Sequence, residues 1–446
     1  MPSMYENEDL NGKIKTSANF WSVTKIISLG SIIILTGALI WVYFKLDDME
    51  KNRQSNNQVF GATTVNSSNS NQNKPEATKP APVKPTSAES STVFFGDVIW
   101  TRYLNQWSEA SNLKEAYPFS GLSTLQPENY DVWIANLECP VTSTRRTAAQ
   151  EDAALKFSCD PKYLPEAAKF FKIFSLANNH TDNMQEVNGL KQTRQYLDEQ
   201  KLEYFGHFDS AVRQDICEVV TIPVRIMQDD KQLSSEQIKQ IKLVDGKASM
   251  PVALCGYNNV FKLPTTADLT VIKQFSEYFP TFVMPHQGLE YKLLPDKYQQ
   301  SYHRQMIDQG ADGVLGGHTH TVMPVENYKG KLIAYSMGNF IFDQQFSRDT
   351  TTGLGLNLEF NFKYNDNLEK WLILGPECVK FKDECLQKAK DQKLTKPDFS
   401  LKFNAIVSDS SNKLTKKADE SLTKATLQRI KWEEVKTSLE NTAAKQ

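Results

Sequence analysis

Short apolar runs alternate with helical patterns through the middle of the chain, and this alternation restricts the possible folds more than any other feature. Between residues 92 and 331, five runs have the length and composition of strands: "STVFFGDVIW", "YDVWIANLE", "IFSLAN", "TFVMPHQG" and "DGVLGG". Helical patterns separate several of them, such as "NMQEVNGLKQTRQYLDEQ" and "PDKYQQSYHRQMIDQG". This order is typical of βαβ units, in which helices connect parallel strands. The sequence therefore predicts an α/β domain with a largely parallel sheet.

The pattern changes after Lys331, where helical spacing becomes rare. Three apolar runs follow one another: "KLIAYSMGNFIF", "GLGLNLEFNFKY" and "EKWLILGPECVKF". Strands joined by short connections pair in the antiparallel direction. We therefore expect the sheets to finish with antiparallel strands, and we expect the domain to span residues 92–385.

Residues 26–44 form a run of 19 residues without a charge, "IISLGSIIILTGALIWVYF". As a helix the run would be about 28 Å long, close to the roughly 30 Å of hydrocarbon in a bilayer. A cleaved signal peptide is the alternative, but its apolar part would be shorter, and no A-x-A-type cleavage site follows. We predict a short N-terminal tail (1–25) and an uncleaved transmembrane anchor (26–44) that crosses the cell membrane once.

The segments on either side of the domain differ from it in composition. Residues 45–91 are rich in Asn, Ser, Gln, Thr and Pro and predict a disordered linker, because they can bury little apolar surface. Basic residues are balanced on the two sides of the anchor, but a short tail before a long domain usually leaves that domain outside the cytoplasm. We expect an extracytoplasmic domain. Residues 386–446 predict a charged, partly helical extension, with one amphipathic surface helix over "SLTKATLQRIKWEEVKTSL".

The overall charge restricts the partners of the chain. Its formal net charge is −2, so no global electrostatic attraction to nucleic acid follows, and we expect no nucleic-acid partner. Binding of any other anion must depend on a local site.

Polar residues of the types that bind metals stand at the ends of five predicted strands. They are Asp97, Asn136, Glu138, Asn179, His180, His286, His318 and His320. Four of the six histidines of the chain belong to this set. In open α/β sheets, sites form at the carboxyl ends of strands. Imidazole, carboxylate and amide ligands suit divalent ions such as Mn, Fe or Zn, and we expect one or two of them.

The motifs "FFGDVIW", "NLECPVT", "SLANNHTDN", "MPHQGLEY", "GGHTH" and "YSMGNFIFD" together resemble the CapA family of poly-γ-glutamate and capsule synthesis proteins. The resemblance covers about residues 92–345. It implies a calcineurin-like metallophosphoesterase fold, a four-layer α/β/β/α sandwich. It also implies a role for each strand-end residue. Asp97 and His320 would bind the first metal and Glu138 would bridge; Asn179, His286 and His318 would bind the second metal; His180 would face the substrate as the catalytic residue.

The chain departs from the metallophosphoesterase pattern at the first motif. The pattern has D-x-H, but Ile99 stands where the histidine would be, so the first metal site lacks one ligand. Four further residues are candidates for substrate binding or for supporting the ligands: Arg102, Asn136, Glu290 and Asn339. Arg102 suits an anionic group, although a surface arginine is an equal alternative. Asn136 is expected to hold Glu138.

Two residue types leave alternatives open. Six cysteines allow fifteen pairings. A bond between Cys139 and Cys159 would tie two loops near the site, and buried thiols are the alternative. Of the two remaining histidines, we expect His303 on a helix surface and His207 in a structural or rim position.

Two classes of function are compatible with these observations. The first is a membrane-anchored, metal-dependent hydrolase or transferase that acts on an anionic polymer or a phosphoester. The second is a non-catalytic, metal-containing component of a capsule export complex that binds polymer. Both would work at the membrane, and other capsule-synthesis membrane proteins are expected partners.

Overall fold

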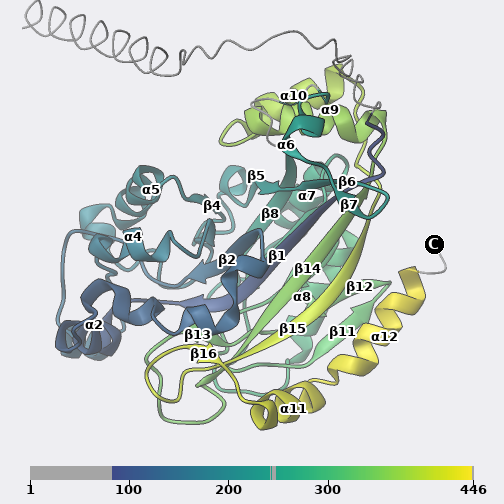
Figure 1. Cartoon of the computed structure of the whole chain (residues 1–446). Helices are drawn as coiled ribbons and strands as arrows, with labels where there is room; N and C mark the ends of the chain where they lie inside the picture. The colour runs from purple at the N-terminus through teal and green to yellow at the C-terminus, as the bar shows by residue number, and fades with distance from the viewer. Residues whose placement is uncertain (1–82, 242, 244–247, 444–446) are drawn as a thin grey trace, which may run out of the picture. The chain divides into compact units, whose positions relative to one another are not determined.

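The computed structural model describes residues 83–446, except 242, 244–247 and 444–446 (Figure 1). The predicted tail, the predicted anchor at residues 26–44 and nearly all of the predicted linker lie outside the described residues. Within the described part of the chain, no helix has both the length and the apolar character needed to cross a membrane.

The first sheet has ten strands and contains both parallel and antiparallel pairs. Its main path follows the order β16-β15-β14-β1-β2-β3-β4, and β13 and β6 also pair with β1 while β7 pairs with β6. The strands are β1 (Ser87–Val98), β2 (Val132–Leu137), β3 (Ile173–Ser175), β4 (Glu203–Phe205), β6 (Arg225–Gln228), β7 (Lys231–Gln232), β13 (Asn339–Ile341), β14 (Thr352–Lys363), β15 (Phe399–Asp409) and β16 (Lys416–Lys417). The path from β1 to β4 is parallel, and β14 pairs antiparallel with β1 and β15.

The second sheet has six strands in the order β11-β12-β10-β9-β8-β5. The strands are β5 (Cys217–Pro223), β8 (Ser249–Asn258), β9 (Thr281–His286), β10 (Gly313–Leu315), β11 (Val325–Tyr328) and β12 (Lys331–Ala334). Its four central strands are parallel, and the two edge strands pair antiparallel. The prediction of parallel strands in the middle of the chain is confirmed. Towards the end, β14, β15 and β16 pair antiparallel as predicted, but β12 and β13 pair parallel with β10 and β1.

The two sheets pack against each other through apolar side chains. The ring of Phe282 on β9 packs near those of Phe94 on β1 and Phe360 on β14, with centroid distances of 6.0 and 5.5 Å. Side chains alternate across a strand, and Val93 and Phe95 belong to a second core on the other face of the first sheet. Burying one such side chain contributes about 1.5–3 kcal/mol, so these two cores hold the layers together.

Helices supply apolar residues to both cores. Leu104, Leu164 and Leu197 enter the core on the outer face of the first sheet, whereas Leu269 and Met306 pack with the second sheet. The helices are α2 (Arg102–Ala110), α3 (Ala148–Ala154), α4 (Leu164–Ala167), α5 (Gly189–Glu199), α6 (Ser235–Ile238), α7 (Thr266–Ser276), α8 (Lys297–Asp308), α9 (Asp366–Leu374), α10 (Lys382–Asp391), α11 (Glu420–Arg429) and α12 (Trp432–Ala443). This mixed α/β arrangement is consistent with a calcineurin-like fold.

The first sheet continues beyond residue 385, where the sequence predicts the end of the domain. β15 pairs with β14 over its whole length, and α12 packs against β11 and β15. The predicted single surface helix is divided at Lys431, whose φ is +59°, and Ile430 and Trp432 beside the break are buried. Charged residues outnumber apolar ones in this segment, but the apolar residues are spaced so that a strand and two helices can each bury one face.

The run "EKWLILGPECVKF" was predicted as a strand, and this prediction is wrong. Its first part belongs to α9, where the Asn365 side chain accepts a hydrogen bond from the backbone N–H of Leu368 at 2.9 Å and caps the helix. Leu368, Trp371 and Leu372 are buried, and this i, i+3, i+4 spacing is helical. Short apolar runs of this kind do not distinguish a buried strand from a buried helix.

All six cysteines are paired. The bonds are Cys139–Cys159, Cys217–Cys255 and Cys378–Cys385. The expected link between the two loops near the site is therefore present, and the alternative of buried thiols is wrong. The bond Cys217–Cys255 joins β5 to β8 within the second sheet.

Candidate metal centre

Two buried carboxylates form the centre of the site. Asp97 is the penultimate residue of β1 and Glu138 directly follows β2, and both are fully buried. Asn136 Nδ2 donates to one Asp97 oxygen at 2.8 Å, and the backbone N–H of His318 donates to the other at 3.2 Å. Neither oxygen of Glu138 has a hydrogen-bond partner among the described residues. Because water is excluded, burial and then the Glu138 charge raise the pKa of Asp97 to about 7, and burial raises the pKa of Glu138 well above its usual range.

Three histidines surround these carboxylates. His286 Nε2 lies 3.3 Å from Glu138 Oε1, and His320 Nδ1 lies 3.7 Å from Asp97 Oδ2. The imidazole rings of His286 and His318 lie 4.8 Å apart between centroids. Burial lowers the pKa of His286 to about 4 and of His320 to about 3, and it lowers the pKa of His318 well below its usual value. The rings are therefore neutral near pH 7, which is the form that binds metals.

Hydrogen bonding fixes the tautomer of His320. Its Nδ1 lies 2.9 Å from Asn339 Oδ1, while the Asn339 amide nitrogen donates to Gln344 and to the Thr350 carbonyl. Asn339 Oδ1 is thus the acceptor and Nδ1 carries the hydrogen, so Nε2 is left free to act as a ligand. Asn339 supports a candidate ligand in this way.

The ligand atoms form two groups that could each hold a metal ion. One group is Glu138, His286 and His318; the other is Asp97, Glu138 and His320; within each group the atoms lie within 4.8 Å of one another. Both groups share Glu138, in agreement with the bridging position that the family resemblance implies. Within the described part of the chain, several of these atoms are buried without a hydrogen-bond partner, namely both Glu138 oxygens, His286 Nε2 and His318 Nδ1, as is the amide oxygen of Asn179. Unpartnered buried polar atoms are costly, and a bound divalent cation would satisfy this set.

The backbone of the GGHTH motif is shaped around the Asp97 carboxylate. A Cβ at Gly317 would lie 2.9 Å from Asp97 Oδ1, so a larger residue would displace the carboxylate. His318 and His320 have φ values of +90° and +57°. Non-glycine residues rarely adopt this left-handed region, and such strain is concentrated at functional sites. The turn places His318 in one ligand group and His320 in the other.

Ile99 cannot substitute for the missing histidine. Its side chain is fully buried in the core on the outer face of the first sheet, and its backbone N–H bonds to the Ile341 carbonyl at 2.8 Å. The group formed by Asp97, Glu138 and His320 therefore receives no ligand from this position.

His180 lies beside the candidate ligands without belonging to either group. Its Nε2 is 4.0 Å from Glu138 Oε1, and its Nδ1 is 2.8 Å from Asn183 Oδ1. That oxygen also accepts the backbone N–H of Phe157. Burial lowers the pKa of His180 to about 4. The neutral ring therefore carries its hydrogen on Nδ1 and presents an unprotonated Nε2.

A cavity of about 830 Å³ opens onto this group. Asn179, His180, His318 and His320 form part of its lining. Glu290 also lines the cavity, where its side chain is exposed. The site therefore opens to a space of the size that ligand pockets have.

Two candidate supporting residues have contacts different from those expected. Asn136 was expected to hold Glu138, but its amide nitrogen instead contacts Asp97 and lies 3.3 Å from His286 Nδ1. Arg102 was considered as a surface residue or an anion ligand. It is buried, it forms an ion pair with Asp343, and its guanidinium lies 4.4 Å from the Phe157 ring centroid.

Sequence reasoning missed Asn178. Its amide nitrogen donates to Asn136 Oδ1 at 3.0 Å and to the Leu137 carbonyl at 2.8 Å, and its oxygen accepts the backbone N–H groups of His180 and Thr181. It thereby joins the ends of β2 and β3. The doubled asparagine before His180 is a signal for such a turn, because Asn side chains bond to backbone groups two residues further on.

His303 was expected on a helix surface, and this expectation is wrong. It is fully buried in α8 and its ring stacks on Tyr335 at 5.4 Å. The helix that carries it faces the second sheet along this side, so the ring fills the core. His207 lies outside both ligand groups and accepts the backbone N–H of Asp209.

The chain is similar in sequence to bacterial capsule synthesis proteins. A family model described as "Bacterial capsule synthesis protein PGA_cap" matches residues 91–344. The "PGA biosynthesis protein CapA" of Bacillus subtilis (strain 168) is 25% identical over 288 residues, which cover 62% of this chain and 68% of the relative. The "Capsule biosynthesis protein CapA" of Bacillus anthracis is 26% identical over 287 residues, which cover 61% of this chain and 65% of the relative. A solved structure, TT1561 of Thermus thermophilus, is 8% identical with a TM-score of 0.33 over 60% of this chain and 93% of that one.

Two sheets whose strand ends meet at a group of buried histidines and carboxylates define an α/β protein with a candidate metal centre. The family model covers more than half of the chain. The chain belongs to the bacterial capsule synthesis protein PGA_cap family.

The substitution His286→Ala should lower metal affinity by at least about 10- to 100-fold, the range found when even an outer-shell partner is lost. The reason is that His286 Nε2 is buried, unpartnered among the described residues and adjacent to Glu138. Bound Mn²⁺ can be measured by calorimetry and by elemental analysis of dialysed protein. His207→Ala serves as a control outside the site. Unchanged Mn²⁺ content in the His286 variant would contradict the assignment.

Metal affinity should also increase with pH. Because the pKa of Asp97 is raised to about 7 by burial and by Glu138, this carboxyl is largely protonated at pH 6 and ionised at pH 8. Binding must release that proton and any proton held by Glu138, whose pKa burial also raises, so Mn²⁺ affinity should be at least about tenfold higher at pH 8 than at pH 6. The histidines stay neutral over this range and add no opposing change. Calorimetric titration at both pH values, with Asp97→Asn as the control, tests this; a pH-independent affinity would refute it.

Proposed function

We propose that this protein is a membrane-anchored, extracytoplasmic enzyme of capsule or poly-γ-glutamate synthesis. In this proposal its domain is a calcineurin-like metallophosphoesterase sandwich of four α/β/β/α layers. It would use one or two divalent ions, Mn, Fe or Zn, to hydrolyse or transfer a bond in an anionic polymer or a phosphoester. The names of the two Bacillus relatives, which refer to PGA and capsule biosynthesis, support the process but do not define the reaction.

One observation carries the proposal of a metal-dependent reaction. Two sets of buried ligand atoms share Glu138, and several of these atoms have no hydrogen-bond partner in the described part of the chain. Asp97 and His320 would hold one ion; Asn179, His286 and His318 would hold the other. When bound, such ions supply Lewis-acid stabilisation of charge that develops on a reacting oxygen and favour ionisation of an attacking water.

His180 is proposed as the catalytic residue. Its unprotonated Nε2 lies beside Glu138 and lines the cavity, while Asn183 holds the opposite ring nitrogen. Nε2 is therefore an acceptor in the neutral ring, able to take a proton from an attacking water or hydroxyl. It can donate a proton to a leaving group only after receiving one.

A second candidate function is favoured by Ile99. Because this side chain lies in the core, the set Asp97, Glu138 and His320 has one ligand fewer than the metallophosphoesterase pattern. A protein with one well-held ion could serve as a non-catalytic, polymer-binding component of a capsule export complex. Other capsule-synthesis membrane proteins would be its partners in either case.

The extracytoplasmic location is proposed on two observations. The uncharged run at residues 26–44 has the length of a membrane span. In addition, all six cysteines are paired, and disulfides persist in oxidising compartments and are rare in the cytosol.

Protease added to intact cells should release the domain by cleavage between residues 52 and 86, because the polar composition of this segment offers accessible peptide bonds. Residues 87–91, which the sequence assigns to the end of the linker, belong to β1 and pair with β14. The released fragment can be identified by mass spectrometry of the medium. A cytosolic marker protein that stays intact is the control. A domain that is cleaved only after the membrane is permeabilised would place it inside and contradict the proposed topology.

The substitution His180→Ala should reduce turnover by about 10²- to 10⁴-fold, the usual contribution of general acid–base catalysis. Mn²⁺ affinity should change little, because His180 belongs to neither ligand group. Initial rates can be measured with bis-(p-nitrophenyl) phosphate and with poly-γ-glutamate on Mn²⁺-loaded protein, with His207→Ala as the control.

Two outcomes separate the candidate functions. If the loaded wild-type domain binds poly-γ-glutamate but cleaves none of these substrates, the non-catalytic role is favoured. If turnover exists and the His180 variant retains all of it, His180 is not the catalytic residue.

A further inference from the structure

We propose that the Cys139–Cys159 disulfide and Phe157 form a positioning unit that sets the orientation of His180 in the site. The proposal concerns the same site as the proposed function and rests on it for its catalytic consequence. Phe157 and the two cysteines are positioning residues, because they act on His180 and not on the reacting atoms.

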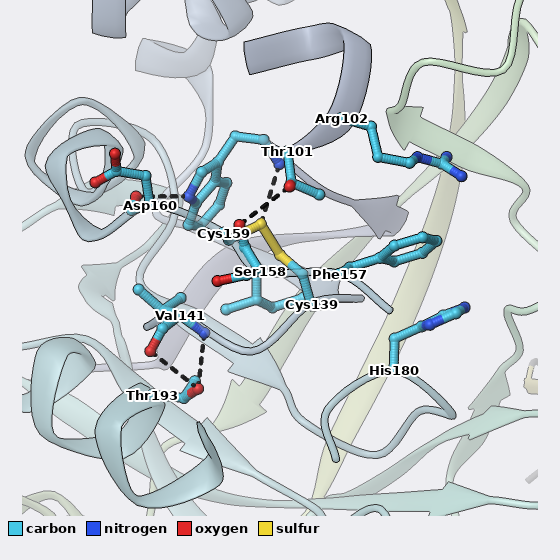
Figure 2. The surroundings of a disulfide bond; sticks show 12 residues. Thr101, Arg102, Cys139, Val141, Phe157, Ser158, Cys159, Asp160, His180 and Thr193 are labelled. Carbon is cyan, nitrogen blue, oxygen red and sulfur yellow. Dashed lines mark hydrogen bonds between the residues drawn. A yellow bond between two sulfur atoms is a disulfide. The ribbon is translucent and has the colours of Figure 1, made fainter. Parts of the chain in front are cut away.

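The disulfide begins at the residue after Glu138, the carboxylate that both candidate ligand groups share. Cys139 follows Glu138 in the sequence, and Cys159 stands two residues after Phe157 (Figure 2). The backbone N–H of Cys159 donates to the Pro140 carbonyl at 2.9 Å, and that of Trp100 approaches Cys159 Sγ at 3.3 Å. The bond thus fastens the segment that carries Phe157 to the ends of β1 and β2.

Phe157 lies between Arg102 and His180 (Figure 2). Its ring stacks on His180 with a centroid distance of 4.0 Å and an interplanar angle of 22°, and the Arg102 guanidinium lies 4.4 Å from its centroid. Stacking and cation–π attraction both favour this order. The backbone N–H of Phe157 also donates to Asn183 Oδ1, the oxygen that holds His180 Nδ1. Phe157 therefore restrains His180 through its ring and through its backbone.

A buried glutamate completes the attachment of this segment. Glu151 accepts the backbone N–H groups of Arg102 and Ser158 at 2.8 and 2.7 Å. The Thr101 hydroxyl oxygen lies 2.6 Å from a Glu151 carboxyl oxygen and 3.0 Å from the Ser158 carbonyl oxygen. These bonds connect the start of α2 to the residue after Phe157. They hold one side of the segment, and the disulfide holds the other.

The position of Phe157 is not set by a strand. It lies between Cys139 and Cys159, which are separated by 20 positions in the sequence, and it falls outside every strand of the first sheet. The candidate ligands differ in this respect: Glu138 follows β2 and its backbone N–H donates to the Val98 carbonyl at 2.9 Å. Loss of the disulfide should therefore disturb His180 far more than it disturbs the ligands.

The test measures the reactivity of His180 towards diethyl pyrocarbonate in metal-free protein, by peptide mass spectrometry. Stacking free energies of aromatic pairs correspond to about a 2- to 10-fold change. In Cys139→Ala/Cys159→Ala, modification of His180 should accelerate by that factor, whereas His207 should react at the wild-type rate. Cys378→Ala/Cys385→Ala is the matched control, since this bond connects the segment after α9 to α10, and it should leave His180 unchanged. Equal His180 rates in the two double variants would overturn the proposal.

A second pair of variants isolates the aromatic contact while the disulfide stays intact. Phe157→Leu keeps apolar bulk but removes the stack and should accelerate modification of His180; Phe157→Tyr keeps the ring and should preserve the wild-type rate. If Phe157→Leu behaves as wild type, the ring does not position His180. Circular dichroism melting identifies any variant that is not folded at the assay temperature. If the Cys139/Cys159 double variant is unfolded, the two Phe157 variants test the proposal instead.

Activity provides the link to the proposed function. With Mn²⁺ and bis-(p-nitrophenyl) phosphate, the Cys139/Cys159 and Phe157→Leu variants should lose kcat with little change in KM or in Mn²⁺ affinity. Equal losses in the Cys378/Cys385 variant would indicate general destabilisation and contradict a positioning role. If the wild-type protein neither binds Mn²⁺ nor turns over substrate, the proposed function fails, and the reactivity of His180 still decides the positioning proposal.

Discussion

The burial of Asp97 and Glu138 side by side is the constraint on which the rest of the site depends. Burial raises the pKa of both carboxyl groups because it disfavours the charged form, and the Glu138 charge raises the pKa of Asp97 further. The surrounding imidazoles are neutral and cannot compensate the charge. Asn136 and the backbone of His318 satisfy Asp97, while Glu138 is left without a hydrogen-bond partner among the described residues. A divalent cation is the simplest group that would balance this charge and satisfy these atoms together.

The two-sheet architecture makes this arrangement possible. Parallel strands bring their carboxyl ends to one edge, and the ends of β1, β2, β3, β9 and β10, with the loops that follow them, carry all the candidate ligands. At that edge the chain adopts strained conformations at His318 and His320, and it places Gly317 where a side chain would displace Asp97. Such strain is tolerated where the surrounding packing determines the backbone. The two apolar cores on either side of the first sheet supply that packing.

A second set of contacts orients side chains around the candidate ligands. Asn178 links the ends of β2 and β3, Asn339 fixes the tautomer of His320, and Phe157 stacks on His180. These contacts connect residues that are distant in the chain, and each one orients a group that faces the cavity. The Cys139–Cys159 bond is one of these contacts, because it joins the strand end beside Glu138 to the segment that contains Phe157. Both the sheet and the loops that follow its strands therefore orient the side chains of the site.

The sequence by itself determined the α/β class, the strand ends that carry the candidate ligands and the family, because these depend on local periodicity and on motifs that are read residue by residue. It did not determine the partners of Asn136 and Arg102, the burial of His303 or the type of the segment that became α9, because each depends on which distant residue lies opposite. The C-terminal strand β15 was missed for the same reason: its apolar face is evident only beside β14. Tertiary structure decided these points, since packing and hydrogen-bond pairing are set by residues far apart in the chain.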